Sequence, residues 1–255
     1  MLGFAPAPGR PLFVLFGSSI ADILLRGYIG WNSRRALQVI DKIFPKDSPV
    51  QPSLVIVYFG GNDSVAAHSS GLGPHVPLEE YIDNMRKIAD HLKSLSEKTR
   101  VIFLSCPPLN EETLRKSTST VLSEIVRTNE TCRLYSEACV SLCKEMDLKV
   151  VDLWNAMQKR DDWATACFTI ISIWINWWFV CDCGWDGLHL SEEGSKIVVE
   201  EILRILKEAE WDPCLHWKAM PTEFGEDSPY DLVSSSGQST VNPSDWTFHR
   251  TIQWD

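Results

Sequence analysis

Three groups of polar residues in the sequence contain the residue types that acyl transfer requires. Gly-Ser-Ser at 17–19 and Gly-Gly-Asn-Asp at 60–63 are expected in loops that follow short apolar runs. Asp-Gly-Leu-His at 186–189 belongs to a third expected loop, 186–191, which stands before an amphipathic stretch. Acyl transfer needs a hydroxyl nucleophile, an imidazole that takes its proton and a carboxylate that orients the imidazole. It also needs N–H donors aimed at the developing oxyanion. The sequence therefore offers a candidate for each role.

Ser19, His189 and Asp186 are the candidates for nucleophile, general base and orienting acid. The backbone N–H groups of Ser19 and Gly27 and the side-chain amide of Asn62 are the candidates for the oxyanion hole. Each group has an ordinary structural interpretation as well, because Gly-Ser-Ser and Gly-Asn-Asp commonly form turns and Asp-x-x-His commonly combines a helix cap with a surface histidine. Their occurrence together at the ends of predicted strands favours the catalytic interpretation.

Apolar runs of four to six residues predict buried strands of a parallel sheet. Stretches with apolar residues at i, i+3 and i+4 lie between them and predict helices with one buried face. Alternating strands and helices predict an α/β sandwich with functional groups at the carboxyl ends of the strands. The predicted strands are 12–16, 54–59, 101–104 and 150–153, with a shorter one at 23–25, and the predicted helices are 78–95, 122–146 and about 192–209, the last capped by Ser191.

The composition is typical of a globular protein and sets limits on its partners. The 255 residues include 24 Lys and Arg against 34 Asp and Glu, a net charge of −10, with 44% hydrophobic residues. An acidic chain without a basic block makes nucleic acid or an anionic membrane an improbable main partner. We expect one domain over residues 1–211 and a tail over 212–255 that packs on it, because periodicity fades there while aromatic residues persist.

The N-terminal segment and the cysteines predict a cytoplasmic protein. The apolar run at 12–16 is too short for a secretory signal, and the longest apolar stretch, 170–181, is too short for a membrane span of roughly twenty residues. The eight cysteines are scattered, so we expect reduced thiols. A zinc site built from Cys181 and Cys183 with Cys167 and His189 is disfavoured, because C-x-C is not a usual ligand pair. We expect neither a metal nor a cofactor.

Four sequence blocks resemble those of the GDSL esterase/lipases, also called SGNH hydrolases. They are VLFGSSI at 14–20, RGYIGWNSR at 26–34, VIVYFGGNDS at 55–64 and DGLHLS at 186–191. Two further stretches, 70–89 and 210–224, look like the plant subgroup similar to isoamyl acetate-hydrolysing esterase.

The resemblance implies a flavodoxin-like three-layer fold and cleavage of carboxylic esters of small or medium acyl groups, lipid-like or acetyl, through an acyl-enzyme. It places the nucleophile on Ser19, because Ser18 stands where GDS has its Asp. It places the oxyanion donors on Gly27 and Asn62 and the Asp/His pair on Asp186 and His189. A carbohydrate acetylesterase is an alternative. A nucleophile elbow of the α/β-hydrolase type around Ser19 is disfavoured, since that fold lacks the Gly-Asn-Asp block.

The chain departs from the family pattern at two places. Only seven residues separate Ser19 from Gly27, whereas a parallel crossover needs about ten to twelve. We therefore expect that the strands at 12–16 and 23–25 cannot both be parallel, or that one is lost. Sixteen residues at 170–185, which carry four tryptophans, separate Cys-Phe-Thr from Asp186. They are interpreted as a hydrophobic lid or as the mark of a splice variant or gene-model product, which leaves a catalytically impaired family member as an alternative.

Three further histidines receive non-catalytic interpretations. His68 and His75 flank a Gly/Ser-rich loop after the Asn62 block, and loop packing is favoured over a place at the mouth of the site. His91 falls between inward positions of a predicted helix and is expected at the surface.

Overall fold

The computed structural model describes residues 13–17, 25–28, 30–117, 126–170, 185–212 and 214–216. The chain forms two units, Met1–Ile205 and Leu206–Asp255. The first unit contains every described strand and the candidate site. The predicted tail beyond residue 216 and the tryptophan-rich residues 171–184 lie outside the described residues. No helix among the described residues has the length and apolar character needed to cross a membrane.

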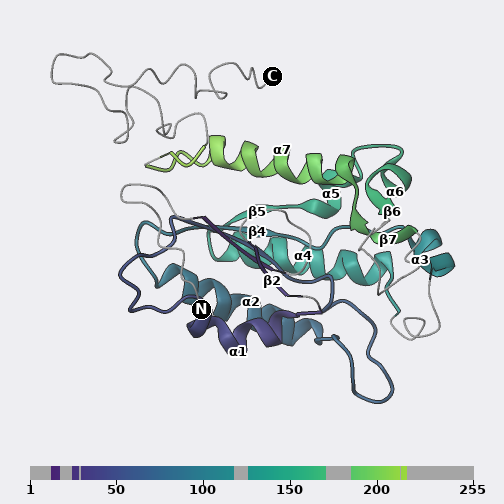
Figure 1. Ribbon diagram of the computed structural model, residues 1–255, viewed down its shortest axis with the longest axis horizontal. Helices are drawn as coiled ribbons and strands as arrows, with labels where there is room; N and C mark the ends of the chain where they lie inside the picture. The colour runs from purple at the N-terminus through teal and green to yellow at the C-terminus, as the bar shows by residue number, and fades with distance from the viewer. Residues whose placement is uncertain are drawn as a thin grey trace, which may run out of the picture. The chain divides into compact units, whose positions relative to one another are not determined.

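A five-stranded parallel sheet forms the centre of the first unit, in the order β2-β1-β3-β4-β5 (Figure 1). Every neighbouring pair in it is parallel. This is the flavodoxin-like strand order, and it confirms the α/β fold predicted from the sequence. The strands are β1 (Phe13–Gly17), β2 (Leu25–Gly27), β3 (Leu54–Tyr58), β4 (Arg100–Leu104) and β5 (Lys149–Val151).

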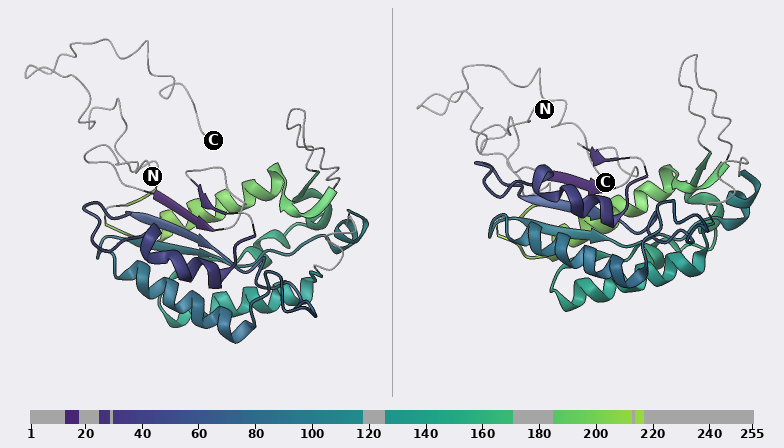
Figure 2. Two further views of the ribbon diagram at one scale, coloured as in Figure 1. Left: turned by 60° about the horizontal axis from the view of Figure 1, so that its bottom comes forward. Right: turned by 90° about the horizontal axis from the view of Figure 1, so that it is seen from below.

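Helices cover the sheet on both faces, as Figures 1 and 2 show. The helices α1 (Ser33–Ile43), α2 (Leu78–Lys93) and α4 (Asn129–Glu145) lie on one face, which we call the α1 face. The opposite face, the α7 face, carries α7 (Glu192–Glu208), of which residues 192–205 belong to the first unit. Shorter elements are α3 (Glu111–Ser117), α5 (Leu153–Met157), α6 (Trp163–Ala166) and the antiparallel pair β6 (Phe168–Ile170) and β7 (Trp185–Leu190).

The largest hydrophobic core lies between the sheet and the α1 face. Alternate residues of the central strands point into it, and the helices contribute apolar residues at helical spacing. Their removal from water is the main favourable term in folding. Fully buried members of this core include Val55, Val57 and Phe103 from the strands and Tyr81, Met85, Ile88 and Leu92 from α2.

The expectation that the first two strands cannot both be parallel is wrong. β1 and β2 pair in parallel, with Leu15 opposite Leu25 and Gly17 opposite Gly27. The physical reason is the short length of β2. From Gly17 the chain has to return only two residues along β1 and move one strand sideways before it pairs, and seven residues are long enough to span that distance.

Two other expectations are corrected and one is confirmed. His91 is buried rather than at the surface, because its Nε2 lies 2.8 Å from the carbonyl oxygen of Phe44 and joins α2 to the end of α1. Residues 186–190, expected as a loop, belong to strand β7, which pairs with β6. Ser191 caps α7 as predicted, since its Oγ accepts a hydrogen bond from the backbone N–H of Gly194 at 3.1 Å.

Candidate active site

The predicted nucleophile and oxyanion segments leave the sheet at one edge. Gly17, Gly27 and Tyr58 are the last residues of β1, β2 and β3, and Gly17 lies beside both of the others in the strand register. The strand order reverses between β1 and β3, and open α/β sheets bind their ligands at such a position. Ser19 lies two residues beyond Gly17 and outside the described residues.

Both ends of the Asn62 amide are held by hydrogen bonds. Nδ2 donates to the carbonyl oxygen of Trp31 at 2.7 Å, and Oδ1 accepts from the guanidinium of Arg127 at 2.7 Å. An amide NH₂ has two N–H groups, so the bond to Trp31 leaves a second one for another acceptor. The amide is therefore fixed in orientation beyond the carboxyl end of β3, and its second N–H is the predicted oxyanion donor.

Asp63 anchors the loop that carries Asn62. Its carboxylate accepts hydrogen bonds from the backbone N–H of Ser33 at 2.9 Å, from the hydroxyl of Ser33 at 2.5 Å and from the backbone N–H of Gly60 at 3.1 Å. The residue is fully buried. Burial raises the pKa of the Asp63 carboxyl, and the hydrogen bonds from Ser33 and Gly60 oppose that rise. Asp63 thus joins the start of α1 to the Asn62 loop and has a structural role.

A glycine at position 60 is required by the backbone of this loop. Gly60 has φ +128°, a conformation that a residue with a Cβ rarely adopts, and a Cβ there would lie 3.3 Å from the Tyr81 hydroxyl. The loop that leads to Asn62 therefore packs closely against Tyr81 of α2.

The strand that carries His189 is fixed at both ends. The carbonyl oxygen of Gly187 accepts a hydrogen bond from the backbone N–H of Asn110 at 2.8 Å, and Gly187 has φ +66°. Ser191 donates its backbone N–H to the Cys167 carbonyl oxygen at 2.9 Å. His189 lies between these anchors and is partly buried. Asp186 belongs to the same strand, and its side chain lies outside the description.

Hydrogen bonds connect the Asn62 loop to β7 through residues far apart in the sequence. Arg127 binds Asn62, and two residues later Asn129 exchanges a pair of 2.9 Å hydrogen bonds with the backbone of Leu109. Asn110 follows Leu109 and binds Gly187. The predicted oxyanion donor and the predicted Asp/His strand therefore belong to one connected network.

Sequence reasoning missed Arg127. No local signal identifies it, because its partner Asn62 is 65 residues away and a single arginine at the start of a helix is commonly a surface residue.

The remaining sequence candidates have structural roles or fall outside the described residues. The ring Nδ1 of His68 lies 2.5 Å from the Ser70 hydroxyl, and that of His75 lies 2.6 Å from the carbonyl oxygen of Val65, as loop packing requires. The six described cysteines are free thiols. Cys181 and Cys183 of the disfavoured zinc site lie outside the described residues.

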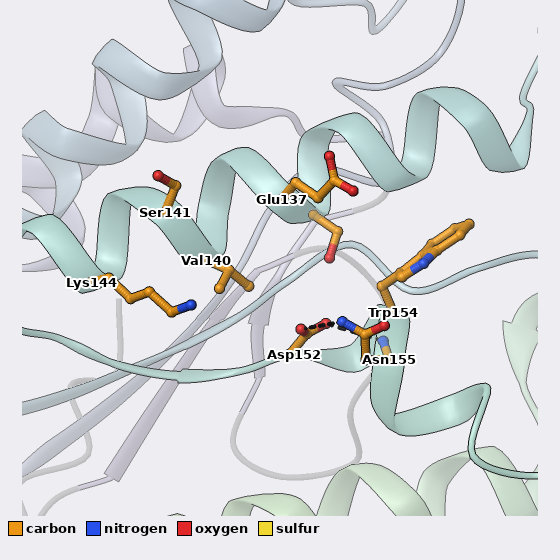
Figure 3. Close-up of a pocket in the computed structure, with 8 residues that line it drawn as sticks. Glu137, Val140, Ser141, Lys144, Asp152, Trp154 and Asn155 are labelled. Carbon is orange, nitrogen blue, oxygen red and sulfur yellow. Dashed lines mark hydrogen bonds between the residues drawn. The ribbon is translucent and has the colours of Figure 1, made fainter.

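A surface hollow of about 340 Å³ lies apart from the predicted site (Figure 3). It lies along α4 and the start of α5, and two of its lining side chains, Asp152 and Asn155, are hydrogen-bonded at 2.6 Å. None of the predicted catalytic residues contributes to it. Its lining is Ser136, Glu137, Val140, Ser141, Lys144, Asp152, Trp154 and Asn155.

Comparison with known proteins finds one family model along most of the chain. The family described as GDSL-like Lipase/Acylhydrolase matches residues 14–202. The chain is 87% identical to the GDSL esterase/lipase WDL1 of Oryza sativa subsp. japonica, with all of both chains covered. It is 58% identical to the GDSL esterase/lipase CPRD49 of Arabidopsis thaliana, which covers 97% of this chain and 99% of the relative.

More distant matches agree with these. The isoamyl acetate-hydrolyzing esterase 1 homolog of Rattus norvegicus is 31% identical over 69% of this chain and 65% of its own length. Among solved structures, the lipase/acylhydrolase from Enterococcus faecalis matches with a TM-score of 0.54 and 17% identity, covering 78% of this chain and 97% of that one. This last match bears on the fold alone.

Proposed function

The chain belongs to the GDSL-like lipase/acylhydrolase family and to its plant esterase/lipases, and from that premise we propose how it cleaves a carboxylic ester. Ser19 Oγ attacks the carbonyl carbon while His189 takes its proton, and Asp186 orients the imidazole. His189 then protonates the departing alcohol. Water attacks the acyl-enzyme with His189 again as the base, which releases the acid and restores Ser19.

The observation that carries this proposal is the meeting of three predicted segments at one edge of the sheet. Gly17, which leads to Ser19, lies beside Gly27 in the register, and the Asn62 loop leaves β3 at the same end. This arrangement supports an oxyanion hole in which the N–H groups of Ser19 and Gly27 and the Asn62 amide bind the oxyanion of the tetrahedral intermediate. No step requires a metal or a cofactor.

The substrate class proposed is an ester of a small or medium acyl group. The name of the rat relative contains isoamyl acetate, an ester of this kind. A panel of p-nitrophenyl esters with increasing acyl length, together with an acetylated sugar, tests the proposal. Turnover confined to the acetylated sugar would replace it with a carbohydrate acetylesterase.

A serine pair provides the test of the catalytic assignment and its matched control. Ser19→Ala is expected to abolish p-nitrophenyl acetate turnover, because it removes the nucleophile. Ser18→Ala changes the neighbouring hydroxyl and is expected to leave turnover nearly unchanged. Initial rates at saturating ester measure both variants. Unchanged turnover in Ser19→Ala, or loss confined to Ser18→Ala, would contradict the assignment.

A second candidate, a family member that has lost turnover, is favoured by one observation. The alignment with the rice relative spans 276 positions against 255 residues in this chain, so at least 21 positions are missing here. The seven-residue link between β1 and β2 is short enough to be such a deletion. Reaction with a fluorophosphonate probe, followed by mapping of the labelled peptide, separates the two candidates, because only an activated Ser19 is labelled.

A further inference from the structure

We propose that Arg127 is a positioning residue for the oxyanion hole, a role that rests on the proposed function. Arg127 donates from Nη2 to Asn62 Oδ1 at 2.7 Å, and this bond is partly buried. Its proposed effect on the reaction passes through Asn62, whose amide is the predicted oxyanion donor.

The chemistry of the two partners determines which way the Asn62 amide points. A guanidinium has only donors, so it must face the amide oxygen, and a carbonyl only accepts, so Trp31 must face the amide nitrogen. Rotating the amide by half a turn would place Nδ2 against Arg127 and Oδ1 against the Trp31 oxygen, and both hydrogen bonds would be lost. Arg127 and Trp31 together therefore fix which end of the amide is the donor, and in the proposed function this donor binds the oxyanion.

The charge of Arg127 also strengthens the donor. A hydrogen bond from a cation to Oδ1 draws electron density away from the amide, and the N–H groups of Nδ2 become more positive. The hydrogen bond from Arg127 to Asn62 then polarises the one that Asn62 donates to the oxyanion. This effect has its full value only when negative charge develops on the substrate oxygen, so it lowers the barrier without tightening ground-state binding.

The segment around Arg127 is held in place independently of the guanidinium. The carbonyl oxygen of Val126 accepts a hydrogen bond from the backbone N–H of Ala66 at 2.9 Å, and Thr128 caps α4 by accepting from the backbone N–H of Thr131 at 3.2 Å. The backbone at 126–128 is thus anchored on both sides of Arg127, so we expect Arg127 variants to retain the local fold.

A double-mutant cycle with Asn62 tests the proposal. Asn62→Ala is expected to lower kcat about 100- to 1000-fold, as loss of one oxyanion donor does. Arg127→Met is expected to lower kcat roughly 10- to 100-fold with KM changed less than about twofold. In the Asn62→Ala background, Arg127→Met should change kcat by less than about twofold, because the group through which it acts is gone.

Two further variants separate a positioning role from a structural one. Arg133→Met makes the same substitution on α4, where the guanidinium binds Glu130 and Glu137 at the surface, and kcat should stay near the wild-type value. Arg127→Lys keeps one charged donor and should recover most of the activity lost in Arg127→Met. If Arg127→Met does not fold, the cycle is measured with Arg127→Lys, whose smaller loss should also vanish in Asn62→Ala.

The outcomes distinguish failure of this proposal from failure of the function on which it rests. An equal fold loss from the Arg127 substitution in wild-type and Asn62→Ala backgrounds would overturn the role of Arg127, as would unchanged kcat in Arg127→Met. Both results leave Ser19-dependent turnover standing. A wild-type protein without Ser19-dependent turnover would overturn the proposed function, and the role of Arg127 with it.

Discussion

The two faces of the sheet are covered to different extents. On the α1 face, α1, α2 and α4 bury alternate residues of β3 and β4, and Val55, Val57 and Phe103 are fully buried. The neighbouring residue Ile56 points to the α7 face, because side chains alternate along a strand. It is only partly buried, although it lies at the centre of the central strand.

The difference lies in the middle of β3. Ile102 of β4 is the register partner of Ile56 on the α7 face, and it is fully buried. Leu54 and Tyr58, at the two ends of β3 on the same face, are buried as well. The α7 face is therefore fully covered at Ile102 of β4 and only partly covered at Ile56 of β3.

The lengths of the connections agree with this difference. The connections β2–β3 and β3–β4 include α1 and α2, whereas β1–β2 has seven residues, too few for a crossover helix. Since parallel crossovers are right-handed and the strand order reverses at β1, a helix in the β1–β2 connection would lie on the α7 face. A connection without such a helix would leave less cover on the α7 face and would not change the α1 face.

The largest expected effect comes from a matched pair of isoleucines. Ile102→Ala should lower the free energy of unfolding by about 2–5 kcal/mol, because it opens a cavity in a fully buried site. Ile56→Ala, on the paired position, should cost only about 1–2 kcal/mol, since less apolar surface returns to water. Urea unfolding curves measure both. Equal losses would show that the α7 face is as well covered at β3 as at β4.

The second prediction concerns Asp63 on the α1 face. Asp63→Asn should cost about 1–3 kcal/mol, because the amide nitrogen must face the N–H of either Ser33 or Gly60 and one hydrogen bond is lost. Asp83→Asn, at an exposed position of α2, is the control. Urea unfolding of both variants measures the loss, and equal costs would remove Asp63 as the anchor of the Asn62 loop.

The pH dependence of the difference in stability between wild type and Asp63→Asn sharpens this test. Burial raises the pKa of folded Asp63 above its unfolded value of about 3.9. The folded protein therefore takes up the proton first as pH falls, and protonation stabilises the fold. This contribution is fully present below the unfolded pKa and is lost as pH rises through the folded pKa. Wild type should thus gain stability relative to Asp63→Asn as the pH is lowered through that window.

The smallest expected effect is at the outer surface of the α1 face. Arg34 of α1 and Glu80 of α2 form two hydrogen bonds of 2.5 and 2.6 Å, and both side chains are exposed. Glu80→Gln should cost less than about 1 kcal/mol, because water and salt screen the pair. Thermal melting at low and high salt measures it, and a loss as large as that of Ile102→Ala would mean that surface charge contributes as much as core packing.

The sequence predicted those parts of the fold that are encoded by local patterns. Apolar runs located β1, β3, β4 and β5 to within two residues, and helical spacing located α2 and α7. The family blocks predicted Gly27 and Asn62 as oxyanion donors, and the register of the strands places Gly27 beside Gly17 at the end of β1. The catalytic roles of Ser19, Asp186 and His189 stay predictions, as do the oxyanion roles of Gly27 and Asn62.

The sequence failed where the outcome depends on partners that are distant along the chain. The helical pattern predicts His91 at the surface, yet its ring Nε2 is hydrogen-bonded to the carbonyl oxygen of Phe44, 47 residues away. From the sequence, residues 186–190 are expected to form a loop. They form a strand instead, because their pairing with β6 supplies the backbone hydrogen bonds. Neither partner follows from periodicity.

By itself the sequence determined the family, the α/β fold and the candidate residues for ester hydrolysis, because blocks of adjacent residues and their periodicity carry that information. Only the tertiary structure decided that Arg127 and Trp31 orient the Asn62 amide and that cover differs between the two faces of the sheet. The physical reason is that a hydrogen bond or a buried surface needs two groups brought together, and chain folding selects the second group from anywhere along the sequence.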